Sequence, residues 1–454
     1  MLRDDYMQES KNTINAKYKE MTEGRVEPLV FRLAAPAMVS MMISSIYNMA
    51  DTYFVGRINT RATAAVGVVF ALMAMIQAVG FCFGQGSGNF ISRRLGARDY
   101  ESTNRMASIG FFSSIIGGLI ITVVGFIFME PLAKILGATD TIMPYAIDYM
   151  KYILVGAPYM AAALTLNSQL RFQGNAFYAM LGITSGGILN IILDPIFIFV
   201  FKMGTGGAAL ATIISQFVSV CVLFYWVRVK GIPIRFKYFK PSKWYYKEIV
   251  RGGSPSLARQ GCGSFATLCL NNVAGNYGDV AIAAMSIVTK IAMAAGSAMI
   301  GFGQGFQPVC GFNYGAKRYD RVKLAFWFCA KFTFCMLFAL SALGWLFAPQ
   351  IIEAFRRDSE VIAIGTRALR WMCMSFPLTG FIVLNNMMAQ TIGKAVRANI
   401  LAMSRQFLFF VPALLILPRV WGLNGLECSQ AVSDTCAFFL SIPMCRSILN
   451  EMKK

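Results

Sequence analysis

The chain has 454 residues, of which 56% are hydrophobic and only 14% are charged, whereas about 25% of the residues are charged in a typical soluble domain. This composition excludes a soluble globular protein and indicates an integral membrane protein, whose length allows about a dozen spanning helices of roughly 20 residues each. The net charge of +20 does not indicate nucleic-acid binding, because the basic residues lie mostly in alternate loops, as they do in membrane proteins.

The expected elements are apolar segments between two charged tails. Residues 1–27 are charged and lack the apolar core of a signal peptide, which predicts a cytoplasmic N-terminal tail. Six apolar segments follow at 29–56, 62–92, 107–128, 142–170, 178–201 and 208–227, and six more at 255–275, 280–303, 324–346, 362–390, 400–417 and 426–445. We therefore expect an N-lobe at 28–228, a basic cytoplasmic linker at 229–253, a C-lobe at 254–446 and a cytoplasmic tail at 447–454.

The distribution of cations predicts the topology. Loops after the even-numbered segments are rich in cations such as Arg93, Arg94 and Arg98, and loops after the odd-numbered segments hold few. The positive-inside rule therefore predicts a multi-pass protein of the cytoplasmic membrane with both termini in the cytoplasm. We expect a monomer whose partners are the lipid bilayer and small molecules.

The two halves of the chain repeat with a displacement of 219 residues. Gly84-Gln85-Gly86 recurs as Gly303-Gln304-Gly305, and Asn167 recurs as Asn386. Because each half holds an even number of helices, the halves have the same orientation and are related by a pseudo-two-fold axis along the membrane normal. The sequence therefore predicts an all-α membrane protein with 12 transmembrane helices in two pseudo-symmetric six-helix lobes, with a binding site in the cleft between them.

A polar patch interrupts the fifth apolar segment. Asn190 and Asp194 are four residues apart and share a helical face, and Pro195 cannot donate a hydrogen bond to the carbonyl of Ile191. A carboxylate inside a membrane span costs about 3 kcal/mol or more. An Asp-Pro turn in solvent is the alternative, but it does not fit a spanning segment.

Three further polar residues are expected at the depth of Asp194. At about 1.5 Å of rise per residue, Asp51, Thr212 and Tyr149 all reach the outer half of the membrane. Two carboxylates in one apolar site suit reversible cation binding, because a proton or sodium ion relieves their desolvation and mutual repulsion. The alternative is that Asp51 and Asp194 only cap or tether helices.

The chain resembles a known transporter family in several motifs. These are Asn48-x-x-Asp51, the Leu170-Arg171-x-x-Gly174 loop, Asn190-x-x-x-Asp194-Pro195 and the doubled Gly-Gln-Gly segments. They resemble the multidrug and toxic compound extrusion (MATE) family of bacterial exporters over residues 28–446. Within the family, the chain is most similar to the branch that keeps its cation-coupling acids in the N-lobe.

The resemblance implies roles for matching residues. Asp51 and Asp194 would bind the driving proton or sodium ion, with Asn190, Thr212 and Tyr149 completing the network. Pro36 matches a proline implicated in bending the first helix. Asn167 matches a cavity-lining amide, although the depth arithmetic places it nearer the inner side.

Two further sets of residues are candidates from their own chemistry. Met38, Met41 and Met42 are soft side chains that suit a promiscuous apolar cavity. Lys290 and Asp434 are expected at similar depth in the C-lobe and suggest an ion pair, and the alternative is that each meets water or a helix-end carbonyl separately.

The sequence therefore predicts a secondary active antiporter that exports apolar, often cationic compounds in exchange for H⁺ or Na⁺. The chain has no histidine and no CxxC pair, so we expect no metal site apart from Na⁺ at the two acids and no cofactor. An enzyme is not expected, because no nucleophile and base pair is recognisable. A lipid-linked saccharide flippase is the alternative, which Lys290 and Arg259 leave open, and a passive channel is a third.

Overall fold

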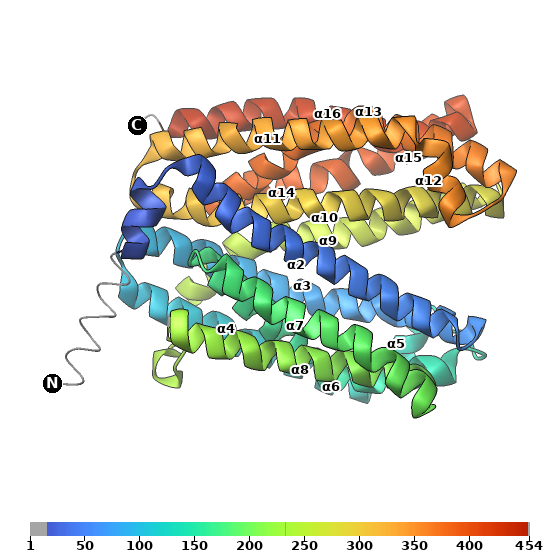
Figure 1. Ribbon diagram of the computed structural model, residues 1–454, viewed down its shortest axis with the longest axis horizontal. Helices are drawn as coiled ribbons and strands as arrows, with labels where there is room; N and C mark the ends of the chain where they lie inside the picture. Colours follow the sequence, from blue (N-terminus) through green and yellow to red (C-terminus); the bar gives the residue numbers. More distant parts are fainter. Residues whose placement is uncertain (1–15, 232, 453–454) are drawn as a thin grey trace.

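The computed structural model describes residues 16–231 and 233–452, so residues 1–15 of the predicted N-terminal tail and 453–454 of the C-terminal tail lie outside the described part. The described chain is almost entirely helical and forms two bodies that separate towards one end of the molecule (Figure 1). Residues 16–23 are also helical and precede the first long helix.

The helices of the N-lobe follow the predicted segments closely. They are α2 (Val26–Gly56), α3 (Thr60–Gly96), α4 (Tyr100–Ile127), α6 (Met143–Phe172), α7 (Ala176–Pro195) with its π-helical continuation η1 (Ile196–Val200), and α8 (Gly204–Lys230). A short helix, α5 (Met129–Ile135), joins α4 to α6. The short 3-10 helix η2 (Phe236–Tyr238) lies in the linker.

The C-lobe repeats this order. Its helices are α9 (Lys243–Gly275), α10 (Asp279–Gly315), α11 (Tyr319–Leu346), α13 (Ser359–Thr391), α14 (Ala395–Met403) continued by η3 (Ser404–Leu408) and α15 (Phe410–Trp421), and α16 (Leu423–Glu451). The short helix α12 (Ala348–Phe355) takes the place that α5 has in the N-lobe. With interrupted helices counted once, the described residues form twelve long helical segments in two lobes, which confirms the predicted fold class.

Ten of these segments are long and apolar enough to cross a membrane by composition alone. The two that fall short are α6 and α9. Polar side chains such as Gln169 and Arg171 are buried in α6, and α9 begins with basic residues of the expected linker. Because α9 starts at Lys243, the second half of that linker is helical rather than a loop.

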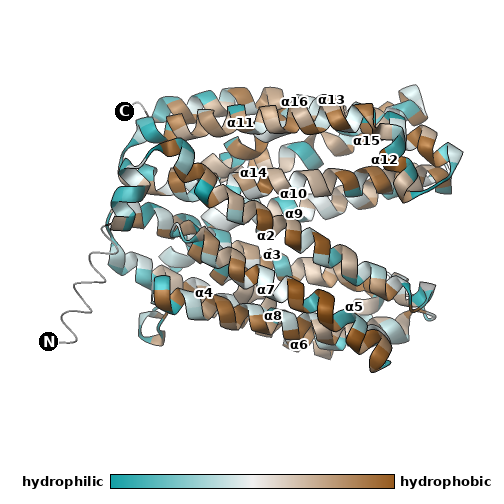
Figure 2. Cartoon of the chain, in the orientation of Figure 1, coloured by the Kyte–Doolittle hydropathy of each residue, from teal (hydrophilic) through white to brown (hydrophobic). Residues whose placement is uncertain are grey.

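The outer surface of the bundle is apolar. Figure 2 shows hydrophobic residues along the lengths of the helices and hydrophilic residues gathered at their ends. Large side chains on this surface are strongly exposed, for example Ile135 at 81% and Val200 at 71%. A surface of this kind is stable only against lipid, as expected for a multi-pass membrane protein.

The first helix of each lobe packs against the other lobe at their interface. The first helix, α2, packs against α7 of its own lobe and α10 of the other, and its counterpart α9 packs against α14 and α3 in the same way. At Gly86 a Cβ atom would meet the backbone of Ile249, and at Gly305 it would meet the backbone of Ala34. The duplicated Gly-Gln-Gly segments therefore allow close backbone approach between the lobes.

Polar contacts fasten the lobes together at the end where the described chain begins and finishes. The Arg93 guanidinium on α3 donates to the carbonyl of Thr391 at 2.5 Å and pairs with Glu248 at 3.0 Å. Thr391 in turn donates its hydroxyl to Asn89 at 2.8 Å. The lobes are thus joined at this end, which makes it the closed end of the molecule in this conformation.

Candidate functional site

The five residues predicted for ion coupling form one cluster inside the N-lobe. Tyr149 donates its hydroxyl to Asp51 Oδ2 at 3.4 Å, which links α6 to α2. Asn190 Nδ2 donates to Asp194 Oδ1 at 3.1 Å and lies 3.4 Å from Thr212 Oγ1, which links α7 to α8. Four helices therefore contribute to the cluster, and the two acids interact electrostatically.

The cluster has more oxygen acceptors than donors. Asp194 and Tyr149 are fully buried, and Asn190 and Thr212 are nearly so. In the described chain, Asp51 Oδ1, Asp194 Oδ2 and Asn190 Oδ1 are buried and receive no hydrogen bond. Because buried polar atoms are normally satisfied, these three oxygens are candidate ligands for a proton or a small cation.

The local structure of α7 explains how Asp194 is presented. The i, i+4 spacing places Asn190 beside Asp194 on one helical face, and Pro195 ends the regular α-helical hydrogen bonding. The chain then continues as the π-helix Ile196–Val200 instead of turning. The fifth segment is therefore one continuous helical span, and its π-helical part begins two residues after Asp194.

A cavity of about 250 Å³ adjoins this cluster in the N-lobe. Asn190 and Thr212 form part of its wall, and Asn167 lines it as well. Asn167 Nδ2 donates to the carbonyl of Ala179 at 2.9 Å, and the repeat-related Asn386 makes the same bond to Ala398 at 2.6 Å. The predicted cavity amide is therefore at the cavity and also ties α6 to α7.

Of the three methionines predicted to line the substrate cavity, only Met41 lines a described cavity. Met41 lines the N-lobe cavity. Met38 instead packs against the buried cluster around α10, close to Gly301, and Met42 is 49% exposed. Neither of them lines either of the two described cavities, although positions i, i+3 and i+4 lie on one broad side of a helix.

Pro36 lies within a helix that continues past it from Val26 to Gly56. The carbonyl of Pro36 accepts the hydroxyl of Ser40 at 2.9 Å. A role for Pro36 in conformational switching stays a prediction.

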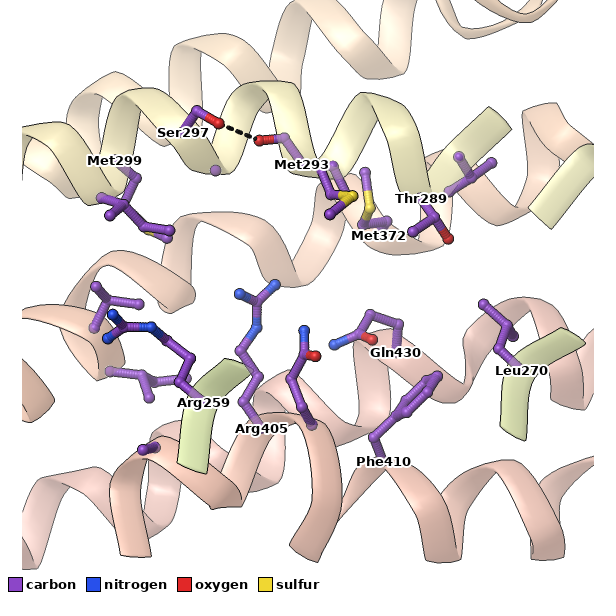
Figure 3. A pocket seen from close by; sticks show the side chains of 18 of the residues that line it. Arg259, Leu270, Thr289, Met293, Ser297, Met299, Met372, Arg405, Phe410 and Gln430 are labelled. Atoms are coloured by element: carbon purple, nitrogen blue, oxygen red, sulfur yellow. Dashed lines mark hydrogen bonds between the residues drawn. The ribbon is translucent and has the colours of Figure 1, made fainter. Parts of the chain in front are cut away.

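The C-lobe contains a second cavity of about 390 Å³, shown in Figure 3. Arg259 and Arg405 point into it, facing Met293 and Ser297 of α10. Arg259 and Ile300 line both cavities, so the two adjoin at the lobe interface.

The predicted ion pair between Lys290 and Asp434 was wrong. Asp434 is fully buried and pairs with Arg405, whose Nε atom lies 2.6 Å from Asp434 Oδ1. Gln430 and Ser375 donate to the same carboxylate at 2.9 and 3.4 Å. The partner of Asp434 is set by the π-helix η3, which carries Arg405 beside α16.

Sequence reasoning missed Arg405 and a second ion pair in the same lobe, in which only the acid is buried. Glu427, which is 2% exposed, accepts hydrogen bonds from Arg367 at 2.8 and 3.1 Å. A signal was present, because Arg405 interrupts the apolar run 400–417 just as Asp194 interrupts 178–201. Inside a membrane span, an arginine is normally paired with an acidic side chain, just as an acid is normally paired with a basic one.

Comparison with known proteins agrees with the repeat and the fold. The MatE family model matches residues 36–196 and again 255–415, two stretches separated by the same displacement of 219. The multidrug export protein MepA of Staphylococcus haemolyticus is 28% identical over 437 residues, with 95% of each chain covered. MepA of Staphylococcus aureus strain MSSA476 is 28% identical over 416 residues, covering 90% of this chain and 91% of that protein.

Solved structures extend the similarity to three dimensions. A MATE crystal structure in complex with MaL6 superposes with a TM-score of 0.91 at 30% sequence identity, covering 96% of this chain and 98% of that one. The outward-facing conformation of a multidrug resistance MATE family transporter gives the same TM-score, identity and coverage. With the duplicated match, the shared fold and the motifs of the two lobes, the chain belongs to the MatE family and is a membrane transporter of the MATE type rather than an enzyme.

Proposed function

We propose that this transporter is a secondary active antiporter that exports apolar, often cationic drug-like compounds in exchange for inward movement of H⁺ or Na⁺. The observation that carries the proposal is the buried cluster of Asp51 and Asp194, in which each carboxylate retains one oxygen without a donor. The names of the relatives, multidrug export proteins, support the substrate class.

The arrangement suggests how ion and substrate communicate. Asn190 donates to Asp194 and lies beside Thr212, and both Asn190 and Thr212 line the N-lobe cavity. An ion bound at the acids therefore acts on the wall of the cavity that a substrate would occupy. Antiport requires that the ion and the substrate favour different conformations, and α2, which carries Asp51 and contacts both lobes, is the element that both ligands would bias.

Transport in proteoliposomes tests this function. Purified protein is reconstituted, an inward H⁺ or Na⁺ gradient is imposed, and movement of an ethidium-like cation is followed by fluorescence. Asp51→Asn and Asp194→Asn are each expected to abolish gradient-driven movement while the protein remains folded, because an amide cannot take up and release a cation charge. Asp279→Asn serves as a matched control, since Asp279 is exposed at the start of α10.

The coupling ion is the one, H⁺ or Na⁺, whose gradient drives substrate movement by the wild-type protein. Full gradient-driven transport by either variant at the cluster would contradict the assignment of the acids. Flux that does not saturate and does not depend on any ion gradient would instead indicate a passive channel.

A further inference from the structure

Two arginine side chains at the N-lobe cavity carry positive charge that the described chain does not neutralise. Arg171 on α6 and Arg259 on α9 both line this cavity. None of the described residues that line it is an aspartate or a glutamate. The cavity is therefore cationic on one wall, in contrast to the acid cluster behind Asn190 and Thr212.

The hydrogen bonding of Arg171 is incomplete. This side chain is 3% exposed, and its Nη1 atom donates to Gln304 at 2.8 Å and to Asn167 at 3.3 Å. Both partners are neutral amides. Its Nε and Nη2 atoms are buried and meet no acceptor in the described part of the protein. The last turn of α6 stabilises a positive charge there, but it leaves two strong donors unused.

The positive charge of Arg259 has even fewer compensating contacts than that of Arg171. It lies in the middle of α9, away from the helix end that would favour a cation. Across residues 16–231 and 233–452 no ion pair or hydrogen bond engages its guanidinium, and its Nη1 atom is buried. Its neighbour in the C-lobe cavity, Arg405, differs because Asp434 neutralises it. Figure 3 shows the guanidinium groups of Arg259 and Arg405 facing the C-lobe cavity.

A guanidinium without a counter-charge costs several kilocalories per mole inside a membrane. Guanidinium groups bind carboxylates, sulfonates and phosphates through paired N–H donors. The remaining lining includes apolar side chains such as Met41, Phe81 and Leu164, which suit the apolar body of the same ligand.

We propose that Arg259 and Arg171 form a subsite for the anionic head group of an amphipathic organic acid, so that the transporter also takes substrates bearing a carboxylate, sulfonate or phosphate. The inference rests on the proposed export function in that it extends its substrate class beyond cations. A zwitterionic compound would then place its anionic group at the arginines and its cationic group towards the acid cluster.

Equilibrium binding to the full-length protein tests the subsite. The protein is placed in nanodiscs of phosphatidylcholine, and calorimetric titrations compare 2-naphthalenesulfonate with the uncharged 2-naphthalenemethanol, with empty nanodiscs as background. Wild type is expected to bind the sulfonate about tenfold or more tightly than the alcohol, since a hydrogen bond to a charged group contributes about 1.5–3 kcal/mol. Arg259→Gln is expected to remove this preference without loss of folding, because Arg259 holds no partner in the described chain.

A matched variant controls for general charge effects. Lys331→Gln removes one positive charge from an exposed site on α11 that lines neither cavity, and it is expected to keep the preference for the sulfonate. Equal affinity of wild type for the two ligands, or an unchanged preference in Arg259→Gln, would overturn the proposal.

Anionic lipid in the nanodisc distinguishes the source of the head group. If phosphatidylglycerol weakens sulfonate binding in wild type but not in Arg259→Gln, the subsite also accepts lipid phosphate. If affinity is unchanged, the subsite selects soluble organic acids. Sulfonate binding is measured without an ion gradient, so the two assays are independent. If the wild type shows no preference for the sulfonate but exports a cation in response to an ion gradient, only this inference is refuted. If it prefers the sulfonate but shows no gradient-driven export, only the antiport is refuted.

Discussion

Breaking the buried ion pair of the C-lobe should destabilise the transporter strongly. Asp434 has a side chain that is 0% exposed, and Arg405 is 19% exposed. The carboxylate accepts hydrogen bonds from Arg405, Gln430 and Ser375. Removing one partner of a buried pair leaves the other charge uncompensated, so Asp434→Leu and Arg405→Met are each expected to cost about 3–5 kcal/mol.

The double variant distinguishes the cost of an unpaired charge from the cost of losing the ion pair itself. Arg405→Met combined with Asp434→Leu replaces the pair by apolar groups, a change that is often neutral or stabilising. The double variant should therefore lie within about 2 kcal/mol of the wild type, far less than the sum of the single costs.

Unfolding by dodecyl sulfate in mixed micelles, followed by tryptophan fluorescence, measures these differences. Lys290→Gln is the control, because Lys290 is exposed and was the partner that depth arithmetic suggested for Asp434; it should change stability by no more than about 0.5 kcal/mol. The reasoning fails if both single variants cost less than about 1 kcal/mol, or if Lys290→Gln destabilises as much as Arg405→Met.

Three further outcomes are expected from the contacts described above. Gly305→Val should push the lobes apart where they approach most closely, since a Cβ atom there meets the backbone of Ala34. Thermal stability and transport should both fall, and wild-type values for both would argue against tight packing at this position. Arg93→Gln should loosen the closed end by removing the bond to Thr391, which increased thiol labelling of a cysteine introduced at that end would detect. Tyr149→Phe removes the hydroxyl donor to the α2 carboxylate and should lower ion-driven transport several-fold, by about 1 kcal/mol for one hydrogen bond, without abolishing it as loss of the acid would.

Local sequence determined the fold class and located the polar cluster of Asp51 and Asp194. Span length and apolar composition depend only on neighbouring residues, so the twelve segments could be located without a structure. The displacement of 219 fixed the duplication, and the heights of Asp51, Tyr149, Asp194 and Thr212 followed from rise per residue. Because the acid-bearing helices are adjacent in one lobe, residues at equal height were also neighbours.

Tertiary structure decided everything that depends on rotation about a helix axis and on the choice of lateral neighbour. Height alone suggested Lys290 for Asp434, but the π-helical turn at 404–408 brings Arg405 to it instead. The same limit applies to Met38 and Met42, which lie on the same side of α2 as Met41 but meet other neighbours, Met38 the cluster around α10 and Met42 the exposed surface. The sequence contained Arg171 and Arg259, yet only the packing of α10 against both α6 and α9 shows that their charges share one cavity without an acid among the described residues that line it.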